Sequence, residues 1–273
     1  TSVAVYNERQ KVEVKLYKDL EKDELFRIGS GDEILHVYFA LYAAEELTAA
    51  DGSVIPADGL IEIAGVQADG TLVFASDLPI GSYYVKEYAV DAPYLISEET
   101  YPITFTYEDD TTAVVRIEVN NGEAIGNRII RGSITGIKVD EQGEPLPGAV
   151  FGLFRADCTD FTMENALLTA RSAEDGSFSF ENIPYGVWLV REIAAPEGYV
   201  LSDEILPVQI GENGQTVGIT VKNRRIPQIP TAPPTGERSA LGFWIGLGSV
   251  ALGGVIACAI MYGKRKRDED DER

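Results

Sequence analysis

The chain of 273 residues carries one sequence pattern twice. The segment Gly81-Ser-Tyr-Tyr-Val-Lys-Glu87 returns 105 positions later as Gly186-Val-Trp-Leu-Val-Arg-Glu192. Upstream of these segments, Phe39-Ala-Leu-Tyr42 matches Phe151-Gly-Leu-Phe154. Because order and spacing are both preserved, the repeat indicates two homologous domains.

The ends of the two copies are marked by Asn127-Arg128 and Asn223-Arg224. They predict a first domain over residues 10–130 and a second over residues 131–226. Residues 1–9 have the pattern of the segment that closes the second copy. We therefore expect them to be the last strand of a truncated upstream repeat.

Short alternating segments separated by turn residues dominate both copies. Val12, Val14 and Leu16 alternate with polar residues, and Ser177-Phe-Ser-Phe180 follows the turn Asp175-Gly176. Helical periodicity is nearly absent before the C-terminal region, with room for a turn or two around 43–47 and 163–168. The sequence predicts an all-β chain of two tandem antiparallel, Ig-like sandwiches.

Composition excludes several classes of function. Asp and Glu number 44 against 23 Lys and Arg, a net charge of −21, which argues against a nucleic-acid partner. With His36 as its single histidine and two cysteines, Cys158 and Cys258, the chain lacks the residues for a histidine-based triad or a Cys/His metal site. We expect no metal, no cofactor and no enzymatic turnover.

Three polar residues recur where a sandwich needs apolar ones. Alternation continues the inward-facing series of each first strand to a lysine, a glutamate ends the repeated strand, and an asparagine closes the last strand. These residues are Lys18, Glu87 and Asn127 in the first copy and Lys138, Glu192 and Asn223 in the second. Buried polar groups are costly unless paired. They can therefore be a buried Lys–Glu ion pair with a turn asparagine, or a reactive set.

The reactive interpretation follows from burial. Burial lowers the pKa of a lysine and raises that of a glutamic acid, which favours a neutral amine beside a neutral acid. A neutral amine is a nucleophile, and an asparagine held against it offers an amide carbon. The glutamic acid can polarise the amide oxygen and carry the proton to departing ammonia. The product is a Lys–Asn isopeptide bond.

The second copy resembles a known family. Lys138-Val-Asp, Pro145-Leu-Pro-Gly-Ala-Val-Phe-Gly-Leu-Phe154 and Trp188-Leu-Val-Arg-Glu192-Ile-Ala-Ala-Pro-Glu-Gly-Tyr199 are similar to the Cna protein B-type (SpaA-like, prealbumin-like) domain of Gram-positive surface proteins and pilins. That family's glutamate motif has Tyr where this chain has Trp188 and Thr where it has Ile193. In the first copy the motif is shifted and lacks its glycine.

The resemblance implies a prealbumin-like fold and specific residue roles. Lys138 and Asn223 would be the bonded pair, with Glu192 as the catalyst. In the first copy, Lys18 and Asn127 would be bonded, with Glu87 catalytic. Lys15 remains an alternative to Lys18, because the first strand offers two registers.

The C-terminal region has three parts. A proline-rich linker covers residues 227–239, an uncharged segment covers 240–262, and a charged tail covers 263–273. As a helix, 240–262 would span roughly 34 Å, which predicts a transmembrane helix with the basic tail in the cytoplasm. The linker contains the motif Ala232, Pro233, Pro234, Thr235 and Gly236.

This arrangement resembles the LPxTG-type sorting signal of Gram-positive cell-wall proteins. It implies that a sortase cleaves after Thr235 and transfers the chain to an amine of peptidoglycan or of a pilin. The alternative is a proline spacer before a permanent membrane anchor. We expect an exported, wall-anchored protein whose precursor spans the membrane.

The favoured function is a cell-surface stalk, adhesin-like or pilin-like, that displays an upstream domain. The alternative is the spacer and anchor region of a surface enzyme whose catalytic domain lies further upstream. A polymerising major pilin would carry a Tyr-Pro-Lys motif, whereas this chain has Tyr101-Pro102-Ile103.

Overall fold

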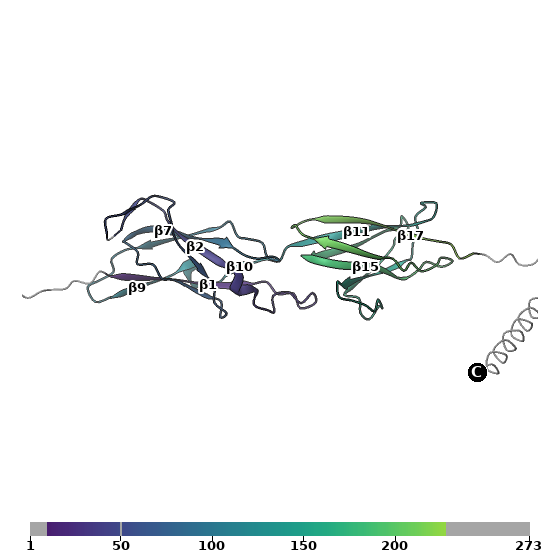
Figure 1. Ribbon diagram of the computed structural model, residues 1–273, viewed down its shortest axis with the longest axis horizontal. Coiled ribbons are helices and arrows are strands. Elements are labelled where there is room, and N and C mark those ends of the chain that lie inside the picture. Colours follow the sequence, from purple (N-terminus) through teal and green to yellow (C-terminus); the bar gives the residue numbers. More distant parts are fainter. Residues whose placement is uncertain (1–9, 50, 228–273) are drawn as a thin grey trace, which may run out of the picture. The chain divides into compact units, whose positions relative to one another are not determined.

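The computed structural model describes residues 10–49 and 51–227, and these residues form strands, turns and two 3-10 turns (Figure 1). The all-β prediction is confirmed. The segments 43–47 and 163–168 form no helix. No helix in the described ranges is long and apolar enough to cross a membrane. Residues 1–9, the sorting motif at 232–236, Cys258 and the apolar segment 240–262 lie outside the described residues.

The N-terminal sandwich contains ten strands and both 3-10 turns. They are β1 (Lys11–Leu20), η1 (Glu33–His36), β2 (Tyr38–Ala43), β3 (Leu47–Thr48), β4 (Val54–Ile55), β5 (Leu60–Gly65), β6 (Thr71–Phe74), β7 (Gly81–Ala89), β8 (Thr100–Phe105), β9 (Val114–Glu118), η2 (Val119–Gly122) and β10 (Ile125–Asn127). One sheet has the order β10-β1-β6 with β9 also paired to β1, and the other has the order β5-β2-β7-β8. In Figure 1, β1 and β9 lie in one layer and β2 and β7 in the other.

The C-terminal sandwich contains seven strands. They are β11 (Arg131–Asp140), β12 (Val150–Arg155), β13 (Leu168–Arg171), β14 (Ser177–Pro184), β15 (Gly186–Ala194), β16 (Ile205–Ile210) and β17 (Thr216–Asn223). Its sheets, β14-β11-β17 and β13-β12-β15-β16, repeat the strand order of the N-terminal sandwich. The sequence repeat is therefore also a repeat of topology.

Most strand pairs are antiparallel, but the first strand of each sandwich pairs in parallel with the last. β1 runs parallel to β9 and β10, and β11 runs parallel to β17 over the range from Ser133 to Asp140. A parallel pair needs a long crossover, and here the rest of each sandwich is that crossover. The first and last strands, which are far apart in sequence, thus lie side by side.

Each sandwich has its own apolar core. Leu16, Phe39 and Val85 are fully buried in the N-terminal core, and Ile134 and Phe151 in the C-terminal core. The alternation that predicts the first strand is confirmed, since Val12, Val14, Leu16 and Lys18 all point inward. The two cores fix the face on which the buried polar residues lie.

Candidate functional site

The described residues include eight buried polar or charged side chains: Lys18, Glu87, Asn127, Lys138, Asp140, Ser172, Glu192 and Asn223. Six of them are the residues singled out from the sequence. Ser172 has an evident structural role, because its hydroxyl donates to the Leu146 carbonyl and accepts from the Ala149 amide. The remaining seven are described below.

The register of the parallel strands places lysine and asparagine in the same relation in both sandwiches. Lys18 lies opposite Ile125 and Leu20 opposite Asn127. Lys138 lies opposite Val221 and Asp140 opposite Asn223. Each asparagine is therefore two residues beyond the partner of the lysine, on the same inward face.

Within the described part of the chain, the Nζ atoms of both lysines donate hydrogen bonds only to backbone carbonyls. Lys18 Nζ donates to the Asp19 and Ile125 carbonyls at 2.8 and 2.7 Å. Lys138 Nζ donates to the Val139 and Val221 carbonyls at 3.1 and 3.3 Å. By contrast, Lys15 points away from the core, with its Nζ 4.7 Å from the centre of the Tyr17 ring. The structure thus buries Lys18 and leaves the alternative lysine outside the core.

The glutamates reach these pairs from the facing sheet. Glu87 lies opposite Phe39 and Glu192 opposite Phe151, each beside a β-bulge at the same place in β2 and β12. A bulge re-aims the side chain next to it. Both glutamates are 2% exposed.

Each glutamate contacts the asparagine directly. The Asn127 Nδ2 donates to Glu87 Oε2 at 2.7 Å, and the Asn223 Nδ2 donates to both carboxylate oxygens of Glu192 at 2.9 Å. The Ser97 and Ser202 amides donate to the same carboxylates at 2.5 and 2.8 Å. In each sandwich the glutamate and the asparagine are therefore in direct contact. The lysine lies on the strand adjacent to the asparagine.

Burial lowers the pKa of both lysines. Desolvation lowers the pKa of Lys18 from 10.5 to about 8, with Glu87 and then Asp19 acting in the opposite direction. Desolvation also lowers the pKa of Lys138, opposed by Glu192 and Asp140. A lowered pKa increases the fraction of neutral, nucleophilic amine.

Three buried oxygens among the described residues have no hydrogen-bond partner: Glu87 Oε1, Asn127 Oδ1 and Asn223 Oδ1. Two of the three are the amide oxygen of the same repeated asparagine. An unpaired buried acceptor costs about 1–3 kcal/mol. A proton on the neighbouring glutamate would supply the missing donor once the carboxamide is turned so that its oxygen faces the acid.

The two sites differ in one charged residue. Asp140 is 2% exposed and lies on the same inward face as Lys138, whereas the N-terminal sandwich has Leu20 at this position. Burial alone would raise the pKa of Asp140, but hydrogen bonds from the Glu144 and Gln142 amides and from Arg225 lower it. Alternation from Lys138 places Asp140 on the inward face, although it was not among the site residues predicted from the sequence.

In a variant that cannot form the Lys18–Asn127 bond, the lowered pKa of Lys18 should make the free energy of unfolding depend on pH. In Asn127→Ala, the unfolded chain keeps the lysine proton up to pH 10.5, whereas the folded chain releases it above about pH 8. The unfolded state then binds more protons, so the free energy of unfolding should rise between pH 8 and 10.5 and gain nothing from this group below pH 8. Urea unfolding of the full chain across this range measures the rise.

The double variant Lys18→Met/Asn127→Ala is the control for this measurement, because all other titrating groups are shared. Its stability should lack the rise that the single variant shows. Parallel pH profiles for the two variants would contradict the lowered Lys18 pKa.

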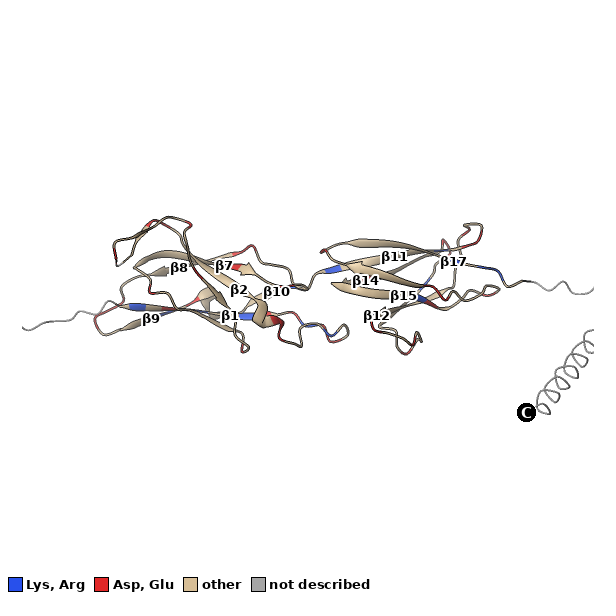
Figure 2. Ribbon diagram, in the orientation of Figure 1, with Lys and Arg blue, Asp and Glu red and all other residues tan. Residues whose placement is uncertain are grey.

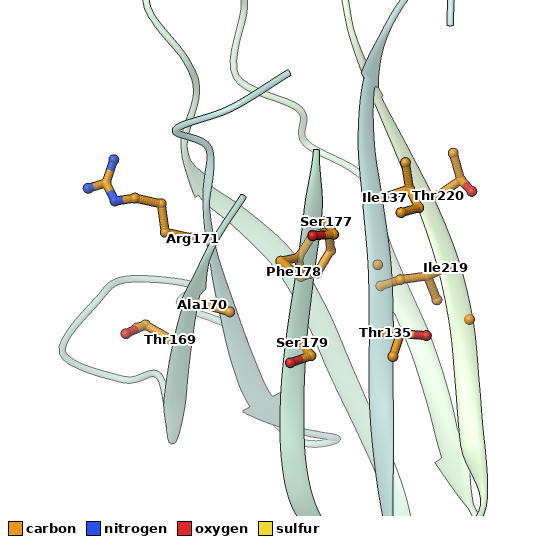
Figure 3. A pocket seen from close by; sticks show the side chains of 12 residues that line it. Thr135, Ile137, Thr169, Ala170, Arg171, Ser177, Phe178, Ser179, Ile219 and Thr220 are labelled. Carbon is orange, nitrogen blue, oxygen red and sulfur yellow. The ribbon is translucent and has the colours of Figure 1, made fainter. Parts of the chain in front are cut away.

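A hollow lies on the C-terminal sandwich, and none of these site residues lines it. Its lining includes Thr135 on β11, Arg171 on β13, and Ser177 and Ser179 on β14 (Figure 3). The guanidinium of Arg171 donates to the Gly148 carbonyl at 3.0 Å. The residues that line the hollow include no carboxylate, so it offers no acid–base pair.

Acidic residues are spread through the loops and strands of both sandwiches (Figure 2). The described residues contain no group of three or more His, Cys, Asp or Glu arranged to hold a metal ion.

Comparison with protein families finds one match, over the C-terminal sandwich. Residues 132–225 match the family model SpaA, described as a prealbumin-like fold domain. The C-terminal sandwich is therefore similar to the domains of this family. No curated protein matches the chain.

Several solved structures are similar to this chain at low sequence identity. The Bacillus anthracis TIE protein matches 79% of this chain at 22% identity with a TM-score of 0.56, and this chain covers 35% of the TIE chain. The minor pilin GBS52 of Streptococcus agalactiae matches 83% of this chain at 17% identity, over 100% of its own length, with a TM-score of 0.33. A C-terminal fragment of the pilus adhesin SpaC from Lactobacillus rhamnosus GG matches 82% at 14% identity, over 100% of its length, with a TM-score of 0.46. The structural similarity to the TIE protein, at a TM-score of 0.56, supports the fold described above.

Proposed function

We propose that this chain is part of a cell-surface stalk, adhesin-like or pilin-like, built from the two repeated domains 10–130 and 131–226. Each domain closes itself with a Lys–Asn isopeptide bond, formed without an external catalyst. The observation that carries the proposal is the same buried set in both sandwiches, in which the asparagine amide oxygen lacks a donor. An ordinary buried ion pair gives no reason for that missing partner.

The chemistry uses only side chains of the chain itself. The neutral Nζ of Lys138 attacks Cγ of Asn223 and forms the new C–N bond, while protonated Glu192 donates a hydrogen bond to Oδ1. Glu192 then passes one proton of the lysine amine to the departing Nδ2, the Cγ–Nδ2 bond breaks, and ammonia leaves. Lys18, Asn127 and Glu87 have the same roles in the first domain.

The strand arrangement brings the lysine and the asparagine close together, and it lets the bond between them carry tension. Because β11 and β17 are adjacent and parallel, lysine and asparagine are held near each other before reaction. After reaction, tension entering at the first strand passes through the covalent bond to the last strand. The rest of the sandwich lies between these residues in sequence and is spared the load.

We propose that the C-terminal region anchors the stalk. A sortase would cleave after Thr235 in the motif at 232–236 and transfer the chain to an amine of peptidoglycan or of a pilin. The segment 240–262 would hold the precursor in the membrane until then. The protein would thus end in the cell wall of a Gram-positive bacterium, as a structural element without turnover.

Intact-mass measurement of the full 273-residue chain tests the bonds. We expect the wild-type mass to be two ammonia molecules below the mass calculated from the sequence. Glu87→Gln and Glu192→Gln should each be only one ammonia below their own calculated masses. Fragmentation should locate the cross-links at Lys18–Asn127 and Lys138–Asn223.

Glu98→Gln and Glu197→Gln are matched controls, because both glutamates are exposed and lie close in sequence to the reactive ones. Both controls should keep the loss of two ammonia molecules. A wild-type chain at its full calculated mass would refute the proposal and leave the three residues as ordinary buried polar groups.

A further inference from the structure

The connection between β1 and β2 contains a short braced loop. Asp23 and Ile28 exchange two backbone hydrogen bonds at 3.0 and 2.9 Å, and the Phe26 amide donates to the Asp23 carboxylate at 3.1 Å. These bonds fix the tip Glu24–Arg27. The aromatic ring at the tip is thus presented by a loop with its own internal support.

This ring is buried outside its own sandwich. Phe26 is 6% exposed and belongs to the core cluster of the C-terminal sandwich. Its ring meets Trp188 edge to face, with ring centres 4.9 Å apart and planes at 76°. Ile28, at the base of the loop, packs against both cores. An edge-to-face arrangement is favourable because the positive ring edge meets the negative ring face.

Arg155 of the C-terminal sandwich donates two hydrogen bonds to the backbone of the same loop. Its Nη1 donates to the Phe26 carbonyl at 3.1 Å and its Nη2 to the Leu25 carbonyl at 2.6 Å. Two parallel donors on a planar guanidinium fix orientation as well as distance.

Arg131, at the start of β11, forms ion pairs with two acidic residues, one directly after β1 and one in the loop. Its Nη2 lies 2.8 Å from Glu21 Oε1 and 2.9 Å from Asp23 Oδ2. Glu21 is itself fixed to the N-terminal sandwich, since its other carboxylate oxygen accepts from the Ile129 amide at 2.9 Å. Arg131 is 18% exposed, so the ion pairs are partly shielded from solvent.

We propose that the loop Asp23–Ile28 is a plug that docks into a socket made by Trp188 and Arg155, so that the two sandwiches move as one rigid body. Separate domains joined by a short linker otherwise move relative to one another. The joint needs no isopeptide bond, and so it stands apart from the proposed cross-linking.

Neither the loop nor the residues that receive it are repeated in the other sandwich. The positions of Trp188 and Arg155 are occupied in the N-terminal sandwich by Tyr83 and Ala43. The connection that corresponds to the plug is only residues 141–149 in the C-terminal sandwich. It contains no aromatic residue. The joint also accounts for Trp188, one of the two residues at which this copy departs from the family motif.

Distance measurements between spin labels test the joint in the full chain, with Cys158 and Cys258 replaced by serine. Nitroxides would be attached at Thr104→Cys on β8 and Thr220→Cys on β17, both exposed strand positions. We expect a narrow distance distribution, and Phe26→Ala should broaden it about twofold. Arg155→Lys, which keeps the aromatic plug and removes the planar fork, should broaden it less.

Phe161→Ala is the matched control, because Phe161 makes an edge-to-face contact with Phe154 at 5.0 Å inside the C-terminal sandwich. It should leave the distribution narrow. A wild-type distribution as broad as that of Phe26→Ala would overturn the proposal, as would a Phe26→Ala distribution as narrow as wild type. The masses of the labelled variants report the isopeptide bonds separately, so failure of the joint and failure of the cross-linking can be distinguished.

Discussion

Replacing Glu192 by glutamine is expected to lower the free energy of unfolding of the C-terminal sandwich by about 4–5 kcal/mol, the value for a covalent closure of this length by analogy with disulfides. Glutamine keeps the shape of the side chain but cannot carry the proton that the reaction requires. The bond from Lys138 to Asn223 would not form, and the unfolded chain would regain the freedom of the whole segment between them.

Denaturant unfolding of the full chain, followed by the fluorescence of Trp188, measures this loss. Trp188 is 6% exposed in the C-terminal core, and a Trp244→Phe background makes it the single tryptophan. Glu197→Gln serves as the control and should unfold like the parent chain. Equal stability of Glu192→Gln and parent would argue against a covalent closure in this domain.

Gly136→Ala is expected to destabilise the C-terminal sandwich by about 3 kcal/mol, because one added methyl group overpacks the core. Gly136 points inward on β11, and the ring of Phe178 occupies the space where a Cβ atom would stand. Phe178 cannot easily move aside, since its ring stacks on Phe151 with ring centres 3.9 Å apart. The same Trp188 fluorescence unfolding curve measures the effect.

Gly218→Ala is the matched control on the neighbouring strand β17. The nearest atom to its added Cβ would be Thr135 Oγ1 at 4.0 Å, an ordinary separation. This variant should be at least as stable as the parent, because alanine has less freedom than glycine in the unfolded chain. If both variants lost stability equally, the loss at Gly136 would come from the strand backbone and not from Phe178.

The all-β class, the repeat and the inward positions of Lys18 and Lys138 could be predicted from the sequence. These features depend on short-range periodicity, because alternate residues of a strand face the same side wherever the strand lies. The alternation from Val12 to Lys18 therefore predicted burial correctly. The same rule would have found Asp140, two residues beyond Lys138.

Only the tertiary structure decided which residues meet. The parallel pairing of β1 with β10 and of β11 with β17 joins strands from opposite ends of each repeat, and local periodicity contains no information about such partners. The same holds for Phe26, which reads as a loop residue in sequence. It is buried because Trp188 and Arg155, more than a hundred residues later, form the surface that covers it. Alternation thus determined which way side chains point, whereas long-range packing determined what they point at.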